Sequence, residues 1–261
     1  MSYDRIILTK DQGLATLTLN VPEKLNAVSR KMIVDIKDCW EKLAQDSSVR
    51  AVLLTGAGRG FCAGADLADP DREGVGGDAG SALEKHFNPV IRLMRALPKP
   101  IIAAVNGPAA GVGMSFALAA DIAVAAKSAT FLQAFARIGL LPDGGSTWFL
   151  PRLVGDQRAR ALAMLAPQIT ATQAKEWGLI WDVVEDADLM KTATDIARRL
   201  ADGPTLSLAR IKEALGRASG NDLSQQLDVE RDFQRELGRS EDFREGVAAF
   251  LGKRKPAFKG K

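Results

Sequence analysis

Residues 99–126 of the chain read KPIIAAVNGPAAGVGMSFALAADIAVAA, and the fold class follows from this stretch. It contains two apolar runs, 100–107 and 121–126, whose composition is typical of strands buried on both faces of a sheet. Between them, Gly111 opens a series of small residues to about residue 120, which predicts a helix. Strand, helix and strand in this order predict a crossover unit with parallel strand pairing.

The same order of elements occurs nearer the N-terminus. The residues DQG at 11–13 separate two runs of strand composition and predict a β-hairpin. A helix with apolar side chains on one face and a buried strand come next. The expected ranges are 5–10 and 14–20 for the hairpin, 28–45 for the helix and 49–55 for the strand, followed by a glycine-rich loop over 68–81 and a helix that ends before Pro98.

The last third of the chain changes character, because helical patterns replace most strands. Helices are predicted over 156–166, 170–177, 188–201, 204–217, 222–238 and 240–251, and short strands over 130–132 and 181–184. We therefore expect an α/β core over residues 1–200 and a helical region over 201–261 that ends in a basic tail. A helical appendage on a core is often used for packing against other subunits.

The composition excludes several classes of protein. Hydrophobic residues make up 46% of the 261 residues and charged residues 26%, which is the balance of a globular domain. A net charge of +3 is too small to favour a nucleic-acid or membrane-surface protein. Two cysteines and one histidine, His86, exclude a disulfide framework and a zinc site with several imidazole ligands, so we expect no metal. The sequence has no secretory segment and no membrane-spanning run, so we expect a cytoplasmic protein.

Several short motifs resemble known sites but lack a required residue. The GAG triplet at 56–58 begins a dinucleotide fingerprint that lacks its third glycine. The segment 69–80 begins like an EF-hand loop, but Gly80 stands where a glutamate is required. The GMSFA segment at 113–117 resembles a nucleophile elbow without its closing glycine. His86 is interpreted either as a general base or as a partly exposed residue without a catalytic role.

Two turns of small residues each follow a predicted parallel strand. They are AGAD at 63–66 and GVG at 111–113, and the second opens a helix. The first amides of a helix lack internal partners and carry the positive end of the helix dipole, and small residues let a ligand oxygen approach them. Two such amides that converge would form an oxyanion hole. Asp143, between Pro142 and Gly144, either caps the helix that starts there or acts as an acid at this site.

Five segments, in their order and spacing, resemble the crotonase superfamily, also called the enoyl-CoA hydratase/isomerase family. They are PEKLNA (22–27), RGFCAGADL (59–67), KPIIAAVNG (99–107), GLLPDGGST (139–147) and AKEWGL (174–179). The resemblance covers nearly the whole chain. It implies an α/β spiral of ββα and βαβ turns with a helical C-terminal trimerisation region, a homotrimer or dimer of trimers, and an acyl-CoA thioester substrate. Coenzyme A is part of that substrate, so no separate cofactor is expected.

The resemblance also implies roles for individual residues. The two backbone N–H groups of the family's oxyanion hole map onto Ala63 and Val112. Phe258 and Lys259 match a tail that reaches CoA in a neighbouring subunit. Positions that hold the substrate map onto Lys24, Phe61, Ala63, Ala65, Asp66, Gly111 and Phe135, the first four at the adenine end of CoA.

Departures from the family pattern point to the reaction. Typical hydratases of the family use two glutamates to position and activate water, and these positions are Ser115 and Phe135 here. Asp143 is the acidic side chain that we assign to the reactive end. One carboxylate without a water-activating pair favours a 1,3 proton shift over hydration. We therefore expect an acyl-CoA isomerase in which Asp143 moves a proton while an enolate is held in the oxyanion hole.

Within the family, Asp143 and its neighbouring segments most resemble isomerases that convert the ring epoxide of phenylacetyl-CoA to an oxepin, which implies phenylacetate or fatty-acid degradation. Three alternatives stay open: an enoyl-CoA hydratase that uses Asp143 with an unidentified partner, an aryl-CoA dehalogenase with Asp143 as nucleophile, and an RNA-binding relative. A dehalogenase would need a tryptophan and a histidine near the ring, where the sequence has Phe135 and Arg92. The near-neutral charge argues against RNA binding.

Overall fold

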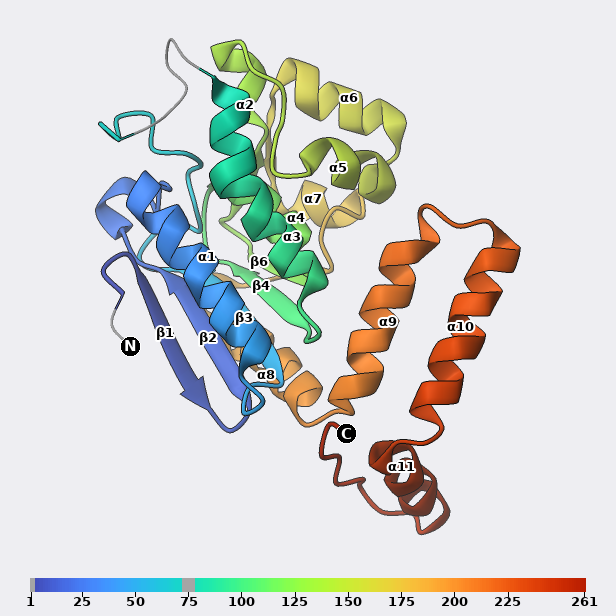
Figure 1. Ribbon diagram of the computed structural model, residues 1–261. Helices are drawn as coiled ribbons and strands as arrows, with labels where there is room; N and C mark the ends of the chain where they lie inside the picture. The colour runs from blue at the N-terminus through green and yellow to red at the C-terminus, as the bar shows by residue number, and fades with distance from the viewer. Residues whose placement is uncertain (1–2, 72–77) are drawn as a thin grey trace.

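The computed structural model describes residues 3–71 and 78–261, and Figure 1 shows a twisted sheet surrounded by helices. Within the described residues, the larger sheet has the strand order β1-β2-β3-β4-β6-β9. The first pair is antiparallel and the following pairs are parallel, which confirms the predicted α/β class. These strands are β1 (Ile6–Asp11), β2 (Leu14–Leu19), β3 (Ala51–Gly56), β4 (Ile101–Val105), β6 (Ile122–Ala126) and β9 (Asp182–Val184).

Helices and a smaller sheet complete the described part of the chain. In the smaller sheet, β7 (Thr130–Leu132) pairs with β5 (Ala109–Ala110) and β8 (Gln168–Thr170). The α-helices are α1 (Arg30–Gln45), α2 (Ala79–Ala82), α3 (Asn88–Ala96), α4 (Val112–Ala119), α5 (Ser146–Val154), α6 (Asp156–Leu165), α7 (Ala171–Glu176), α8 (Leu189–Ala201), α9 (Thr205–Ala218), α10 (Leu223–Leu237) and α11 (Glu241–Leu251). The 3-10 turns are η1 (Pro22–Lys24), η3 (Ala134–Ile138) and η4 (Asp186–Asp188), and η2 (Leu83–Phe87) is a π-turn. No helix among the described residues is long and apolar enough to cross a membrane.

The predicted hairpin forms with a two-residue turn. Asp11 pairs with Leu14, so Gln12 and Gly13 make the turn, with φ angles of +43° and +83°. Positive φ at both turn positions matches the right-handed twist of the flanking strands, and glycine adopts it without steric cost. The hairpin therefore joins the two antiparallel strands at the edge of the sheet.

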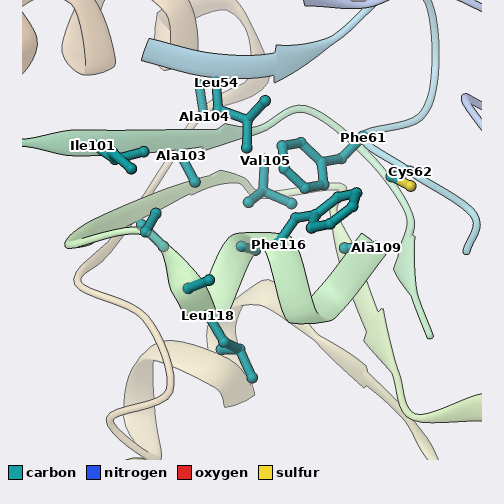
Figure 2. Close-up of a cluster of buried hydrophobic side chains, with 14 of the residues drawn as sticks. Leu54, Phe61, Cys62, Ile101, Ala103, Ala104, Val105, Ala109, Phe116 and Leu118 are labelled. Atoms are coloured by element: carbon teal, nitrogen blue, oxygen red, sulfur yellow. The ribbon is translucent and has the colours of Figure 1, made fainter. Parts of the chain in front are cut away.

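The hydrophobic core lies around the central strands. All residues of β3 and β4 are buried, as expected for parallel strands covered on both faces. Helix α8 packs against these strands, and α1 and α3 lie side by side across the sheet (Figure 1). Beside β4, the rings of Phe61 and Phe116 fill the space between the sheet and α4 (Figure 2).

Most predicted helices in the last third begin one residue later than expected. Thr170, Asp222 and Ser240 belong to the predicted ranges, but each stands outside its helix as the N-cap and accepts a hydrogen bond from a backbone N–H of the first turn. The start of α1 differs for a tertiary reason. Ser29 caps it by accepting from the Met32 N–H at 3.3 Å, while Val28 leaves the helix to pair with Ala65.

The helix predicted before Pro98 is interrupted by the π-turn η2. Pro89 has no N–H to donate to the carbonyl four residues back, and its ring crowds that carbonyl. The Asn88 N–H instead donates to the Leu83 carbonyl, five residues back. The wider turn follows α2 and precedes α3, and π-turns of this kind occur often at functional sites. Residues 72–77 of the loop predicted over 68–81 lie outside the described residues.

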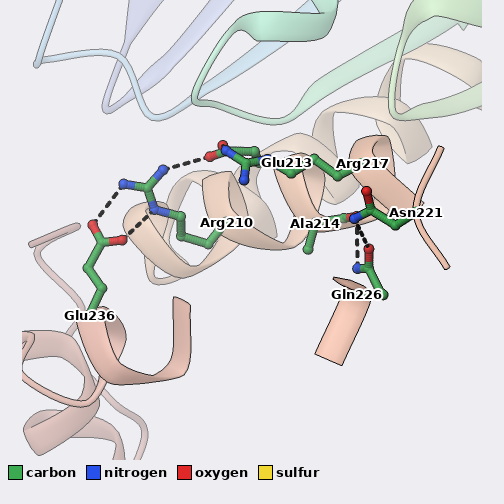
Figure 3. A network of polar contacts seen from close by, with 7 residues as sticks. All are labelled: Arg210, Glu213, Ala214, Arg217, Asn221, Gln226 and Glu236. Carbon is green, nitrogen blue, oxygen red and sulfur yellow. Dashed lines mark hydrogen bonds and ion pairs between the residues drawn. The ribbon is translucent and has the colours of Figure 1, made fainter. Parts of the chain in front are cut away.

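Helices α9 to α11 extend beyond the sheet (Figure 1). Arg210 ties α9 to α10 through two hydrogen bonds to Glu236, at 2.7 and 2.8 Å, and Gln226 donates to the Ala214 carbonyl (Figure 3). The buried Lys212 ammonium holds α9 to the core by contacting Asp121 at 2.9 Å and the Met94 carbonyl at 2.9 Å. The domain boundary near residue 200 stays a prediction.

The basic tail is folded against α11 and the core. The buried Asp242 carboxylate accepts hydrogen bonds from the Lys259 and Gly260 N–H groups at 2.7 and 2.8 Å. Arg50, on the core, donates to the Phe258 carbonyl at 3.1 Å and to Thr205 at 2.9 Å. These contacts connect the end of the chain to the start of α9.

We expect Lys212→Met to lower the free energy of unfolding by about 3 kcal/mol, because it removes a buried ammonium that satisfies Asp121 and a buried carbonyl. Lys191→Met is the matched control, since Lys191 forms an exposed pair with Asp195 and its loss should cost under about 0.5 kcal/mol. Urea unfolding of both variants checks the difference. Equal losses would show that Lys212 does not anchor α9.

Candidate active site

A cavity of about 500 Å³ opens between the start of α1, the 63–71 segment, the α2–η2–α3 helix and the 134–147 segment. Its walls are mainly apolar, with Leu83, Phe87 and Ile138 among them. Such a concave, mostly apolar site with a few polar groups is typical of small-molecule binding. The predicted site residues that line it are Ala63, Ala65, Asp66, Gly111, Val112, Phe135 and Asp143.

Close backbone contact brings two sides of this cavity together. The Ala110 N–H donates to the Cys62 carbonyl at 2.9 Å, and Cys62 pairs with Ala109. A Cβ added to Gly113 would lie 2.1 Å from the same carbonyl oxygen, so the first turn of α4 fits here only with glycine. The start of α4 is thereby fixed beside the 62–65 segment.

The structure corrects one of the two predicted oxyanion-hole residues. The Ala63 N–H donates to the Leu25 carbonyl at 2.9 Å and is therefore already used. Ala65 forms a parallel β-bridge with Val28. The Val28 N–H donates to the Gly64 carbonyl, and the Val28 carbonyl accepts the Asp66 N–H. In an extended strand these bonds leave the Ala65 N–H pointing away from Val28. No hydrogen bond between described residues uses it, and Ala65 lines the cavity.

Val112, the other residue predicted for the oxyanion hole, also lines the cavity. It is the first residue of α4, where a backbone N–H has no acceptor within the helix. Gly111 precedes it with φ +53° and its own N–H donates to the Leu132 carbonyl at 2.9 Å. Ala65 and Val112 thus both line one cavity, at the positive end of α4, and neither N–H group has a hydrogen-bond acceptor in the part of the chain that the structure describes.

Asp143 lies in the wall of the same cavity. Its side chain does not cap α5, which begins at Ser146 with Gly145 as N-cap. The Asp143 Oδ1 atom is buried and has no hydrogen-bond partner among the described residues. Burial raises the pKa of the Asp143 carboxyl from 3.8 to about 6, because the charged form is poorly solvated. A carboxyl with these properties in a cavity is suited to take up and release protons near neutral pH.

The two positions of the family's glutamates differ in their surroundings. Phe135 lines the cavity, and its ring Cζ atom lies 3.7 Å from where a Cβ on Gly111 would stand. Ser115 is fully buried on α4 and does not line the cavity. A Cβ on Gly144 would lie 2.7 Å from the Ser115 Cβ atom, so the 143–145 segment covers this serine.

Four predicted ligand-binding residues lie outside the cavity lining. The Phe61 ring is fully buried in the core (Figure 2), so a contact between this side chain and CoA is excluded in this arrangement. Lys24 is half-exposed near the cavity and contacts Asp66 at 2.7 Å, and this ammonium holds the pKa of the Asp66 carboxyl below its usual value. Phe258 and Lys259 lie with the tail at the base of α9, so one chain does not bring them to its own cavity.

The sequence alone gives little information about the part of the cavity wall that contains Arg30 and His86. Arg30 and His86 line the cavity and their side chains contact each other. The sequence leaves two interpretations of His86 open, and it does not reveal the π-turn in which this residue lies. Among the described residues, no group of three or more side chains of the usual metal-ligating types comes together.

The chain is similar to known proteins over nearly its whole length. The family described as "Enoyl-CoA hydratase/isomerase" matches residues 9–261. The 1,2-epoxyphenylacetyl-CoA isomerase of Escherichia coli (strain K12) is 51% identical over 253 residues, which cover 96% of this chain and 97% of that protein. A probable enoyl-CoA hydratase of Rhodobacter capsulatus is 44% identical over 261 residues, all of both chains.

A solved structure agrees with these sequence matches. The crystal structure of a putative enoyl-CoA hydratase from Streptomyces coelicolor A3(2) superposes with a TM-score of 0.94 at 36% identity, covering 100% of this chain and 96% of that one. The crotonase fold expected from the five motifs is therefore confirmed. The chain is an enzyme that belongs to the enoyl-CoA hydratase/isomerase family.

Proposed function

We propose that this enzyme is a CoA-thioester isomerase that uses Asp143 as its acid–base group. One observation carries the proposal: a buried carboxyl with an unpartnered oxygen and a raised pKa shares a cavity with the unused Ala65 and Val112 amides, among the described residues. Such a site can accept a proton and stabilise the negative charge that its removal creates.

The reaction is a proton transfer within the substrate. The thioester carbonyl oxygen accepts hydrogen bonds from the Ala65 and Val112 N–H groups. The Asp143 carboxylate removes a proton from a substrate carbon, and the electron pair of the broken C–H bond moves into the conjugated system, giving an enolate or dienolate with charge on that oxygen. Asp143 then returns the proton to a different carbon, so no atom is gained or lost.

Isomerisation is favoured over hydration by the side chains around Asp143. Hydration needs a second group to activate water. Of the three other carboxylates among the described residues of the cavity, Asp66 contacts Lys24, Asp69 accepts a hydrogen bond from the Arg30 N–H, and Asp71 is exposed to solvent. Phe135 puts an apolar ring where a typical hydratase of the family has a glutamate.

We propose that the acyl group is a phenylacetyl ring epoxide or an unsaturated chain. In the chain, the proton transfer shifts the double bond. In the ring epoxide, the C–C bond between the two epoxide carbons also breaks, and its electrons become part of the double bonds of the seven-membered oxepin. The apolar cavity walls and the name of the E. coli relative support this substrate class. The corresponding role is in phenylacetate or fatty-acid degradation in the cytoplasm. A requirement for no cofactor beyond the substrate's own CoA stays a prediction.

We further propose a homotrimer, or a dimer of trimers, formed by the helical C-terminal region. Large apolar side chains are exposed on α9 to α11, where one chain leaves them uncovered: Ile211, Leu215, Leu223, Leu227, Phe243, Val247, Phe250 and Leu251. A second copy of this chain would cover them. In such an assembly, Phe258 and Lys259 could contact the CoA of a neighbouring subunit.

Asp143→Asn should lower kcat for isomerisation of a linear 3-enoyl-CoA by roughly 10²–10⁴-fold, because the amide cannot accept the proton. Binding of CoA thioesters should change little, since the Ala65 and Val112 amides remain. Steady-state kinetics and calorimetric binding of a saturated acyl-CoA measure the two effects. Unchanged kcat would eliminate Asp143 as the acid–base group. Solvent ¹⁸O in Asp143 after turnover would instead support the dehalogenase alternative.

The same variant should be more stable than the wild type at neutral pH. Since the native pKa of Asp143 is raised from 3.8 to about 6, ionisation costs native-state stability as pH rises through this window. The stability advantage of the Asp143→Asn variant should therefore be larger at pH 8 than at pH 4.5, by on the order of 2 kcal/mol. Denaturant unfolding at both pH values checks this. An equal advantage at both would show that Asp143 is not buried as a charge.

Lys259→Ala should raise the KM for acyl-CoA several-fold and leave kcat nearly unchanged, if the tail reaches CoA in the assembly. An ammonium near a phosphate contributes binding energy but lies far from the reacting carbon. The wild-type KM should also rise with salt, which screens this contact. Lys255→Ala, an exposed neighbour in the tail, is the control. An equal rise in KM in both variants, or an unchanged KM in both, would contradict a specific contact of Lys259 with CoA.

A further inference from the structure

Three buried polar side chains lie behind Asp143, on the side away from the cavity. Gln133 precedes η3, Ser146 begins α5 and Ser115 lies in the middle of α4. Each is 0% exposed, and none lines the cavity. Burial of polar groups is costly unless they are hydrogen-bonded, so their partners are informative.

The three side chains form one chain of hydrogen bonds that ends at Asp143. The Gln133 Nε2 group donates to the Ser146 Oγ atom at 3.0 Å, and the two serine Oγ atoms are 2.8 Å apart. The Ser115 Oγ atom lies 3.0 Å from the Asp143 backbone carbonyl oxygen. Because each hydroxyl has one proton, Ser146 donates to Ser115 and Ser115 donates to Asp143.

The alternative acceptor for Ser115 is weaker. The Gly111 carbonyl oxygen lies 3.3 Å from the Ser115 Oγ atom and already accepts the Ser115 N–H within α4. Donation to Asp143 is shorter, at 3.0 Å, and the Ser146 proton goes to Ser115 in either case. Hydrogen-bond donation therefore runs from Gln133 towards Asp143, and each serine hydroxyl proton is used in one bond.

This chain fixes the backbone of Asp143 and leaves its carboxylate available. The Asp143 carbonyl also accepts the Ser146 N–H at 3.0 Å, so two donors hold one peptide group. Its carboxylate Oδ1 atom has no partner among the described residues. Ser115 lies three residues after Val112, so the same helix carries the oxyanion amide and the anchor of the base.

The network also has an unsatisfied atom. Gln133 Oε1 is buried and has no hydrogen-bond partner within the described ranges. A partly satisfied buried network costs stability compared with apolar packing. Hydrogen bonds fix the position and rotation of a group more strictly than apolar contacts do. The network can therefore hold the Asp143 backbone in one orientation in exchange for this loss of stability.

We propose that Ser115, Ser146 and Gln133 are positioning residues, which hold the Asp143 carboxylate at its reacting distance from a substrate bound to the Val112 amide. This inference rests on the proposed role of Asp143. It gives a role to Ser115, which occupies a position used for catalysis in typical hydratases but does not face the substrate cavity here. None of the three residues is among those that line the cavity.

The test compares Ser115→Ala, Ser146→Ala and the double variant with Thr55→Val. Thr55 is the matched control, because its buried hydroxyl donates to the Ala104 carbonyl at 2.9 Å in the core strands, outside the network. Two reactions are followed in each enzyme. One is isomerisation of a linear 3-enoyl-CoA, and the other is exchange of the α-protons of phenylacetyl-CoA in D₂O, measured by mass spectrometry.

We expect each serine variant to lower kcat and the exchange rate by roughly 10–100-fold, with KM within about threefold, because a misplacement of about 1 Å suffices for such a loss. The double variant should be no slower than the slower single variant, since both break one chain. Thr55→Val should keep kcat within about twofold of the wild-type value, even if its melting temperature falls as much as that of the serine variants. Loss of stability with unchanged kcat and exchange in the serine variants would overturn the inference.

A further variant covers poor folding of the alanine proteins. Ser115→Cys keeps a group of similar size with a weaker donor, so its kcat should fall clearly below the wild-type value but above that of any folded alanine variant. A kcat equal to that of the wild type would overturn the inference. Failure of the proposed function gives a different pattern, because Asp143→Asn would then isomerise and exchange as fast as the wild type.

Discussion

The contact between the first turn of α4 and the Cys62 carbonyl is the constraint on which the site depends. A Cβ on Gly113 would come within 2.1 Å of that oxygen, so the two chain segments meet at backbone distance. This contact joins the segment after β3 to the segment after β4, which are neighbouring parallel strands. Parallel pairing brings both carboxyl ends to one edge of the sheet, and ligands commonly bind at such edges. The buried rings of Phe61 and Phe116 lie close to Cys62 in the core (Figure 2).

The electrostatics of the site contrast with those of the rest of the chain. Lys212 and Asp66 are buried but contact groups of opposite charge, and many exposed charges form ion pairs. Asp143 is buried without such a partner among the described residues, and its pKa rises for that reason. An unpaired buried carboxyl lowers stability, but a carboxyl whose pKa is close to neutral pH is suited to take up and release protons. Ser115 bonds to the backbone carbonyl of Asp143 and not to its carboxylate. It therefore holds the position of Asp143 without neutralising the charge of its side chain.

The sequence predicted the strands and helices closely where the signals are local. The hairpin turn at Gln12 and Gly13, the buried strands β3 and β4 and the capped C-terminal helices follow from turn residues, apolar runs and N-cap side chains. The short strands β5 and β8 were not predicted, because they have no pattern of their own and form only by pairing with β7. The π-turn at 83–87 also escaped prediction, since the apolar spacing around it is that of an ordinary helix.

By itself, the sequence determined the family, the α/β class and the candidate residues Asp143 and Val112, because these depend on residue types in a fixed order along the chain. Only the tertiary structure showed that the Ala63 N–H is already bonded to the Leu25 carbonyl while the Ala65 N–H faces away from Val28. It also buried the Phe61 side chain in the core and placed Ser115 outside the cavity lining. The physical reason is the same in each case. Whether a polar group is available depends on partners that are distant in the sequence, and no local pattern encodes the direction in which that group points.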